Sequence, residues 1–384
     1  MIYLDTAATS LIKPPQVYEW AERAMRTCAN PGRSGHRPAL EAGRMVYETR
    51  EKAAAFFGVS DPDRVIFTSN ATDSLNLAIR GMVRPGGHVI VTSMEHNSVL
   101  RPVQTLADAG EIQMKVVWGD PVGGRVTVED IEAALRPETC LVVCTHASNV
   151  TGTRMPAERI AGLCREKGVP FLLDASQTAG AYPIDMEKWG VDLLACPGHK
   201  GLLGLPGTGL LCLGPGVRPA PLKQGGTGSF SEKLRQPELL PDRYESGTLN
   251  TVGIASLGAG LDWLTEYGVD RLRLREEQLC ARLLAGLNEI PGVRVYGPGD
   301  AAQRAAVVLF NIAGMDCSEV SFRLDREYGI CTRSGLHCAP LAHQTVGSFP
   351  VGGVRMSMGP FTTEEEIDAA LTAISALAAG TSAI

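Results

Sequence analysis

The 384-residue sequence predicts an α/β fold, with a large domain built on a seven-stranded, mainly parallel sheet and a smaller C-terminal α+β domain. From Arg64 onward, short apolar runs alternate with segments of helical periodicity, a pattern typical of parallel sheets with helices on both faces. After about Gly216 the alternation ends in a Gly/Pro-rich segment, and shorter strand and helix patterns follow. We therefore expect residues 15–250 to form the large domain, and residues 1–14 with 251–384 to form the small one.

Hydrophobic patterns locate the elements of the large domain. Short apolar runs bounded by Gly, Pro or polar residues are typical of buried strands, and they occur at 64–69, 88–93, 113–119, 140–148, 171–176, 192–198 and 208–214. Apolar residues three and four positions apart indicate helices, which we expect at 16–28, 39–57, 73–83, 97–109, 128–136 and 156–168. The first residues, up to the Pro14-Pro15 pair, are expected to be extended.

The second part of the chain has shorter and more varied elements. One long helix is expected near residues 252–288, and it is followed by the strand patterns RVYGP, AVVLFNI, ICTRSG and VRMSMG. Two further helices are expected at 317–328 and 364–379. This mixture predicts the smaller α+β domain.

Composition restricts the classes of function. The net charge of −6 argues against a general binder of nucleic acid or of anionic membranes. No apolar stretch is long enough to span a membrane, and residues 1–5 lack the basic start and apolar run of a signal peptide. The ten cysteines include no C-x-x-C pair and no His-rich cluster, so we expect no metal site and free thiols in a reducing cytoplasm.

The segment 171–209 carries the chemistry most directly. Its first strand pattern is followed by Asp174 and Gln177, and its second by His199 and Lys200. Ligands of parallel α/β sheets bind beyond the carboxyl ends of the strands, so both pairs are expected in one crevice. A lysine that forms a Schiff base and an acid that pairs with the ring nitrogen suit pyridoxal phosphate (PLP). The alternative for this segment alone is a surface lysine and a helix-capping aspartate.

Polar residues also follow three other strand patterns. Ala71 and Thr72 begin a helix whose free N–H groups attract phosphate, although helix capping by Ser69 or Asn70 explains this composition equally well. His96 follows the second strand and would stack on a planar cofactor, whereas an isolated histidine in a loop is commonly incidental. Asn149 lies in a turn suited to a ring oxygen, but asparagine is common in turns. Taken together, polar residues of these types at several strand ends predict one shared crevice more strongly than any one of the residues does alone.

These residues belong to a wider pattern. In order, the chain contains LDTAATS, FTSNATDSLNL, MEHNS, HASNVTGT, DASQTAG, GHKGLLG, YESGTLNT, RSGLHCA and VRMSMG. With this order and spacing, nearly the whole chain resembles a class V aminotransferase-fold enzyme, specifically a cysteine desulfurase of the selenocysteine-lyase-like branch. The resemblance implies PLP as the cofactor and the fold type I architecture of PLP-dependent transferases.

The resemblance implies a role for each residue around the cofactor ring. Lys200 would form the Schiff base, and Asp174 would pair with the ring nitrogen. Gln177 and Asn149 would contact the hydroxyl side of the ring. His96 would stack on the ring and is expected to be catalytic, as is Lys200.

The same resemblance assigns the phosphate contacts. Ala71, Thr72 and His199 would hold the phosphate, and Thr248 would reach the phosphate of the neighbouring subunit, which implies a homodimer. Pro197 departs from the family, which usually has a hydroxyl residue at this position. Proline has neither a hydroxyl nor an N–H, so one phosphate contact is absent. The sequence leaves open whether the affinity for the cofactor is lower or another donor compensates.

Cys338, in RSGLHCA, is the expected catalytic nucleophile. The thiolate is the reactive form, and cations lower the pKa of a thiol; Arg333 and His337 are close in sequence. Judged alone, any one of the ten cysteines is more commonly inert. Arg355 fits a bidentate clamp for the substrate carboxylate, or else an ordinary surface arginine. Arg333 and Asn149 are further candidates for substrate binding.

The reaction implied by the resemblance converts L-cysteine to L-alanine and carries the sulfur as a persulfide on Cys338 to an acceptor protein, for iron–sulfur cluster or thio-cofactor assembly. The residue pattern alone supports a PLP enzyme that acts on an amino acid. A selenocysteine lyase acting on L-selenocysteine would use the same site, whereas another class V aminotransferase, lyase or epimerase would not need Cys338. A binding or regulatory relative without activity would be expected to lack Lys200, which is present.

Overall fold

A seven-stranded sheet lies at the centre of the larger part of the chain, in the order β2-β8-β7-β6-β5-β3-β4. The computed structural model describes residues 1–32 and 34–381. The strands are β2 (Val65–Thr68), β3 (Gly87–Thr92), β4 (Ile112–Val117), β5 (Thr139–Thr145), β6 (Phe171–Asp174), β7 (Leu193–Pro197) and β8 (Gly209–Leu213). β8 runs antiparallel to both neighbours, and the other pairs are parallel. The predicted seven-stranded, mainly parallel sheet is confirmed, and each strand overlaps its expected range.

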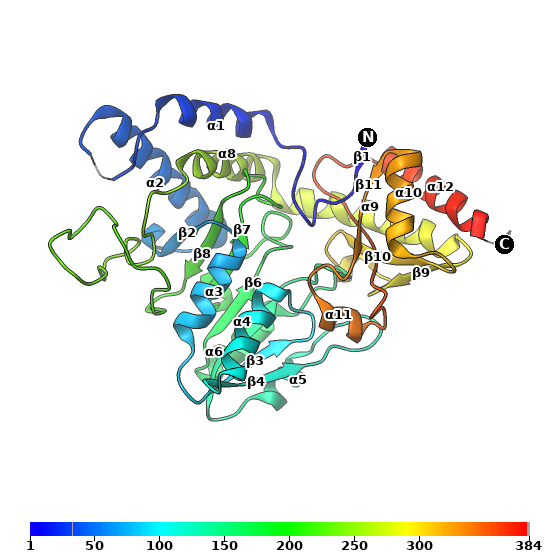
Figure 1. Ribbon diagram of the computed structural model, residues 1–384, viewed down its shortest axis with the longest axis horizontal. Coiled ribbons are helices and arrows are strands. Elements are labelled where there is room, and N and C mark those ends of the chain that lie inside the picture. Colours follow the sequence, from blue (N-terminus) through cyan, green and yellow to red (C-terminus); the bar gives the residue numbers. More distant parts are fainter. Residues whose placement is uncertain (33, 382–384) are drawn as a thin grey trace.

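Helices cover both faces of this sheet (Figure 1). On one face lie α3 (Ala71–Met82) and α4 (Asn97–Asp108), whose apolar residues join one core cluster. On the other face, α2 (Arg37–Phe57), α6 (Ala157–Lys167) and α8 (Thr251–Tyr267) contribute to a second cluster. The remaining helices of this part are α1 (Pro15–Thr27), α5 (Val128–Ala134) and α7 (Met186–Trp189). None of the helices in the described chain has the length and hydropathy needed to cross a bilayer.

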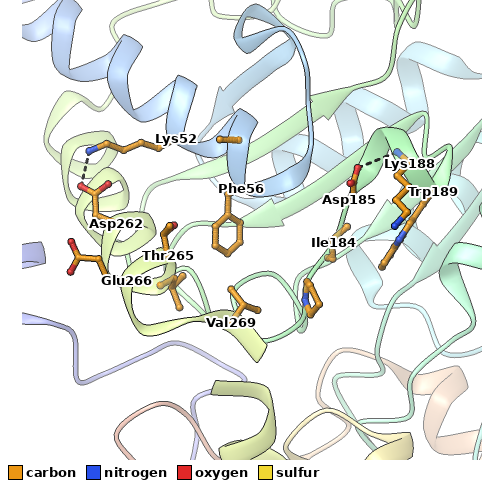
Figure 2. A pocket seen from close by; sticks show the side chains of 13 residues that line it. Lys52, Phe56, Ile184, Asp185, Lys188, Trp189, Asp262, Thr265, Glu266 and Val269 are labelled. Carbon is orange, nitrogen blue, oxygen red and sulfur yellow. Dashed lines mark hydrogen bonds and ion pairs between the residues drawn. The ribbon is translucent and has the colours of Figure 1, made fainter. Parts of the chain in front are cut away.

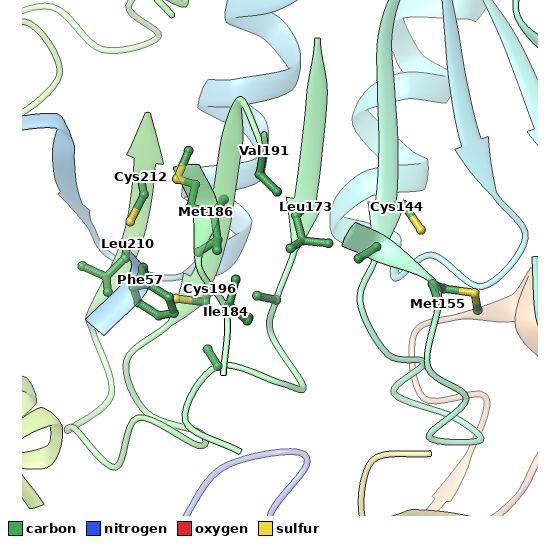
Figure 3. Close-up of a cluster of buried hydrophobic side chains, with 14 of the residues drawn as sticks. Phe57, Cys144, Met155, Leu173, Ile184, Met186, Val191, Cys196, Leu210 and Cys212 are labelled. Carbon is green, nitrogen blue, oxygen red and sulfur yellow. The ribbon is translucent and has the colours of Figure 1, made fainter. Parts of the chain in front are cut away.

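Consecutive residues of the central strands point to opposite faces of the sheet. Leu173 and Leu210 pack in the cluster that contains Phe57 of α2 (Figure 3). Their neighbours Leu172 and Leu211 pack in the cluster on the other face. Because both faces are buried, the strands are held firmly, and the residues that follow their ends have fixed positions.

A second sheet organises the C-terminal part of the chain. Its four antiparallel strands have the order β12-β13-β10-β9, and β1 pairs with β11 beside it. These strands are β1 (Ile2–Tyr3), β9 (Val293–Tyr296), β10 (Val307–Ile312), β11 (Ile330–Cys331), β12 (Arg333–Gly335) and β13 (Gly353–Ser357). The helices are α9 (Val269–Glu289), α10 (Cys317–Tyr328), α11 (Pro340–Thr345) and α12 (Glu364–Thr381). α9, α10 and α12 share a core cluster with β10 and β13, so this part has a core of its own.

The single long helix expected near residues 252–288 is a wrong prediction. The structure has two helices there, α8 and α9, which meet at Gly268. The φ of Gly268 is +89°, a conformation that favours glycine and interrupts the helix. Ile254 of α8 packs in the core of the large sheet, whereas Leu283 of α9 packs in the small one. The domain boundary after residue 250 stays a prediction, and this packing favours a boundary closer to Gly268.

A buried ion pair joins α2 to the segment before α8. The two terminal guanidinium nitrogens of Arg50 each lie 2.8 Å from a Glu245 oxygen, and the N–H of Phe67 donates to Glu245 at 2.7 Å. We expect Glu245→Ala to lower the free energy of unfolding by about 3–5 kcal/mol, because a buried guanidinium loses its partner. Urea denaturation would measure this. The matched control is Glu22→Ala, which removes the exposed pair with Arg26 and is expected to cost about 0–1 kcal/mol. Equal losses in the two variants would contradict the prediction.

Candidate active site

One pocket lies beyond the carboxyl ends of the parallel strands and beside the start of α3. The strand register explains why their polar residues meet: Thr145 of β5 pairs with Asp174 of β6, which pairs with Ala195 of β7. The pocket is lined by eight of the nine predicted cofactor residues, namely Ala71, Thr72, His96, Asn149, Asp174, Gln177, His199 and Lys200.

Lys200 lies in the turn after β7. No described residue forms a hydrogen bond or ion pair with its ammonium group. Burial and, to a smaller extent, Arg355 lower the pKa of Lys200 to about 8, whereas Asp174 acts in the opposite direction. Asp174 is buried at the end of β6 and accepts a hydrogen bond from the N–H of Ser176 at 2.9 Å. The pocket therefore holds an unpaired amine, partly uncharged near neutral pH, together with a buried carboxylate.

The N-terminus of α3 forms another end of the pocket. Asn70 caps the helix with its side-chain oxygen. In the described chain, the N–H groups of Ala71 and Thr72 donate to no acceptor, so both are available to an anion. His199 Nδ1 lies 3.0 Å from Thr9 Oγ1, and burial lowers the pKa of His199 to about 4. This end suits a phosphate, bound by backbone N–H groups and a neutral imidazole.

His96 is joined to the same helix end through Ser98. His96 Nδ1 accepts from the N–H of Ser98 at 3.0 Å, so in the neutral ring the proton is on Nε2. Burial lowers the pKa of His96 to about 4, which keeps the ring neutral. The Ser98 hydroxyl lies 2.8 Å from that of Thr72. The same hydroxyl lies 2.8 Å from His96 Nδ1, so Ser98 joins His96 to the start of α3. Pro197 lines the same pocket with neither a hydroxyl nor an N–H.

The two side-chain amides of the pocket are anchored to other parts of the chain. Gln177 Nε2 donates to the backbone oxygen of Ala7 at 3.2 Å. Asn149 Nδ2 donates to the backbone oxygen of His337 at 2.7 Å. Since His337 precedes Cys338, Asn149 connects the pocket directly to the loop that carries the expected nucleophile.

Arg355 and Arg333 lie directly opposite each other on β13 and β12. Arg355 is buried, and its guanidinium donates to Asp5 Oδ1 at 2.6 Å and to the backbone oxygen of Asn149 at 3.1 Å. Burial lowers the pKa of Arg355, although Asp5 acts in the opposite direction. Two adjacent guanidinium groups attract a carboxylate, but a substrate carboxylate would have to compete with Asp5. Arg355 therefore lies beside the pocket residue Asn149, and part of its hydrogen-bonding capacity is already used by Asp5 and Asn149.

Cys338 is the one exposed thiol among the ten cysteines, all of which lie in the described ranges. Its Sγ lies 3.7 Å from a guanidinium nitrogen of Arg333. The backbone of Cys338 has a φ of +57°, in the left-handed region. Its carbonyl accepts from the N–H of Asn97 at 2.7 Å, at the start of α4 and next to His96. The predicted nucleophile is thus accessible and tied to the edge of the pocket.

Thr248 is the one predicted cofactor residue that is not in the pocket of its own chain. It is exposed, in the segment between β8 and α8, which contains no helix or strand in the structure and extends away from the sheet (Figure 1). Its predicted contact with a neighbouring subunit stays a prediction.

Several residues that support the site were not predicted from the sequence. Asp5 holds Arg355, and Ser98 connects His96 to Thr72. Both residues belong to motifs of the sequence pattern, LDTAATS and MEHNS. The motifs were therefore noticed, but no role was predicted for these two residues. His343, which contacts His337, lies outside those motifs and gave no signal.

A wider pocket of about 810 Å³ lies elsewhere, between the C-terminal ends of α2 and α8 and the residues around α7 (Figure 2). Phe56 and Trp189 contribute its apolar surface, and Lys52 pairs with Asp262 at 2.7 Å. It contains none of the predicted site residues.

A family model for class V aminotransferases matches residues 2–370. The chain belongs to the class V aminotransferase family. Among curated members, a protein of Methanothermobacter thermautotrophicus named probable cysteine desulfurase is 36% identical over 372 residues, which cover 95% of this chain and 92% of that protein. The resemblance found in the sequence is thereby confirmed.

Solved structures of cysteine desulfurases have the same fold. The apo structure of a cysteine desulfurase from Thermococcus onnurineus NA1 superposes with a TM-score of 0.89 and 30% identity, covering 99% of this chain and 95% of that one. A cysteine desulfurase from Escherichia coli superposes with a TM-score of 0.86 and 25% identity, covering 97% and 94%. The expected fold class, PLP-dependent transferase fold type I, is confirmed.

Proposed function

We propose that this protein is a PLP-dependent cysteine desulfurase that converts L-cysteine to L-alanine and carries the sulfur as a persulfide on Cys338. The observation that carries the proposal is the position of Cys338. It is an exposed thiol beside Arg333, on a loop bound to Asn149 at the rim of the pocket that contains Lys200. The names of the relatives support the same reaction.

The residues present fit PLP. The pocket offers an amine without a partner, a buried carboxylate and two backbone N–H groups without acceptors, at Lys200, Asp174 and Ala71–Thr72. These are the groups needed for the aldehyde, the ring nitrogen and the phosphate. When bound, PLP supplies an electron sink for the charge that develops on the substrate.

The chain's own groups would then divide the work. Lys200, with its pKa lowered by burial to about 8, is suited to move the proton at Cα of the substrate. Asp174 would hold the proton on the ring nitrogen, and the neutral His96 would cover the ring. Arg355 and Arg333 would bind the substrate carboxylate once it displaces Asp5 from Arg355.

The sulfur step belongs to Cys338. Its thiolate would attack the substrate sulfur, so that an S–S bond forms while the C–S bond breaks. The electron pair of the broken C–S bond would stay with the carbon fragment, which would take up protons and become alanine. The exposure of Cys338 would then allow an acceptor protein to take the sulfur; no oxidant is required.

Two measurements test the proposed function. The purified protein should absorb visible light with PLP bound, and it should form alanine and an enzyme persulfide in equal amounts from L-cysteine before any reductant is added. Alanine formed without a persulfide, or no turnover of L-cysteine, would overturn the proposal. L-Selenocysteine in parallel assays would decide between sulfur and selenium.

We further propose that Thr248 serves the site of a partner subunit in a homodimer, because it is exposed and distant in sequence from the other phosphate contacts. Lys200→Ala and Thr248→Ala chains should each be inactive or weak alone. Mixed dimers should recover activity, since one of the two sites would have both residues. The control mixes wild-type chains with each variant, and no recovery after verified subunit exchange would contradict the sharing.

A further inference from the structure

Three buried side chains lie behind the Cys338 loop. His337, His343 and Ser348 are almost fully buried, with exposed fractions of 2%, 0% and 4%. His337 Nδ1 lies 3.2 Å from His343 Nε2, and His343 Nδ1 lies 2.7 Å from Ser348 Oγ. At the other end, His337 Nε2 lies 3.1 Å from the backbone oxygen of Arg333. The three side chains thus form a continuous hydrogen-bonded chain from Ser348 to Arg333.

One arrangement of protons satisfies all three contacts with neutral rings. The carbonyl oxygen of Arg333 can only accept, so His337 must carry its proton on Nε2. His337 Nδ1 is then an acceptor, and His343 Nε2–H donates to it. His343 Nδ1 in turn accepts from the hydroxyl of Ser348. Every donor therefore points toward Arg333, and a second proton on His337 would place two N–H donors against each other.

The surroundings keep both rings neutral. Burial lowers the pKa of His343 to about 4. The pKa of His337 is lowered to about 2, mainly by burial and then by Arg355, while the contact with the Arg333 carbonyl acts in the opposite direction. The proton arrangement described above is therefore maintained near neutral pH.

The backbone beside this chain adopts an unfavourable conformation. His337 and Cys338 have φ angles of +50° and +57°, consecutive left-handed positions in residues other than glycine. Such residues persist only where the surrounding structure holds them. Here the Asn149 side chain and the Asn97 N–H hold the carbonyls of His337 and Cys338, and the imidazole chain holds the side chain of His337.

We propose that His343, together with Ser348, is a positioning residue for the sulfur step: the chain Ser348–His343–His337–Arg333 holds Cys338 and Arg333 in place at the edge of the pocket. This role rests on the proposed function for its chemistry. His343 is not among the residues that line the pocket, and its imidazole reaches the Cys338 loop through His337.

The variant His343→Phe tests the proposal because it keeps a ring and removes both nitrogens. We expect kcat for alanine formation to fall about 10- to 100-fold, the effect of a small displacement of a reacting group. The KM for L-cysteine and the visible absorption of bound PLP should change little. His343→Gln retains an N–H near the position of Nε2 and should recover most of the lost rate.

Hydrogen–deuterium exchange gives a readout that does not depend on activity. In His343→Phe, amides of residues 336–349 should exchange about tenfold faster, because the segment loses a buried hydrogen bond, while β6 and β7 stay unchanged. Ser348→Ala should show a smaller increase in the same segment. The control is His88→Phe, which removes a buried imidazole bonded to Thr139 at the start of β3, and it should leave residues 336–349 unchanged.

The outcomes are decisive in each case. Wild-type kcat and exchange in His343→Phe, or identical behaviour of the Phe and Gln variants, would overturn the proposal, because the N–H would then be unnecessary. If His343→Phe does not fold, Ser348→Ala with wild-type exchange in residues 336–349 would overturn it instead. If the wild-type protein makes no alanine from L-cysteine, the proposed function fails, while the exchange data still decide whether His343 holds the loop.

Discussion

Replacing Lys200 with alanine is expected to abolish the covalent, borohydride-reducible adduct with PLP and to lower alanine formation by at least about 10⁴-fold. Lys200 would act both as the amine that binds the cofactor and as the group that moves the substrate proton, and each role contributes orders of magnitude. Mass spectrometry after borohydride reduction would locate the adduct. Lys52→Ala, in the separate pocket near α8, is the matched control and should retain both the adduct and the activity. A wild-type yield of adduct in the Lys200 variant would refute the assignment.

The rate of covalent PLP uptake by the apo-protein should also depend on pH in a defined direction. Burial lowers the pKa of Lys200 to about 8, and only the uncharged amine attacks an aldehyde. The rate should therefore rise as the pH increases from 6 and level off above about 8. An ordinary lysine, with a pKa near 10.4, would show a rate that continues to rise to about pH 10.

Replacing Cys338 with serine is expected to remove the enzyme persulfide and to lower alanine formation from L-cysteine by about 10²-fold or more, because serine is a poor nucleophile toward sulfur. Cys338 is exposed and outside the set of pocket residues, so the PLP absorption and its change on addition of L-cysteine should remain. Alanine formation from L-selenocysteine should be affected less, since selenium leaves more readily.

The control for this variant is Cys331→Ser. Cys331 lies on β11, is partly exposed and is seven positions before Cys338, and its replacement should leave persulfide formation intact. If the Cys338 variant releases sulfide from L-cysteine at the wild-type rate, Cys338 is not the nucleophile. The chain would then be a PLP lyase of another kind.

Local pattern was sufficient for most of the architecture. Strands β3, β5, β6, β7 and β8 are short runs buried on both faces, and the signal for such a strand lies in consecutive residues. Because parallel strands present their carboxyl ends at one edge, the same pattern also brought His96, Asn149, Asp174 and Lys200 into one predicted crevice. The site could be predicted to this extent because it follows from strand order and polarity.

Contacts between residues distant in sequence were decided only by the tertiary structure. Asp5 meets Arg355 across 350 positions, and Asn149 meets His337 across 188. The type of one residue does not reveal its partner, because many side chains can form the same hydrogen bond. Which pair forms depends on the distance and direction between the two groups in the folded chain. The interruption between α8 and α9 at Gly268 was likewise decided by tertiary packing, since a glycine within a helical pattern is tolerated unless packing requires a turn there. Thus the sequence determined which groups gather at the pocket, and the folded chain determined which of them are already paired and how Cys338 is held.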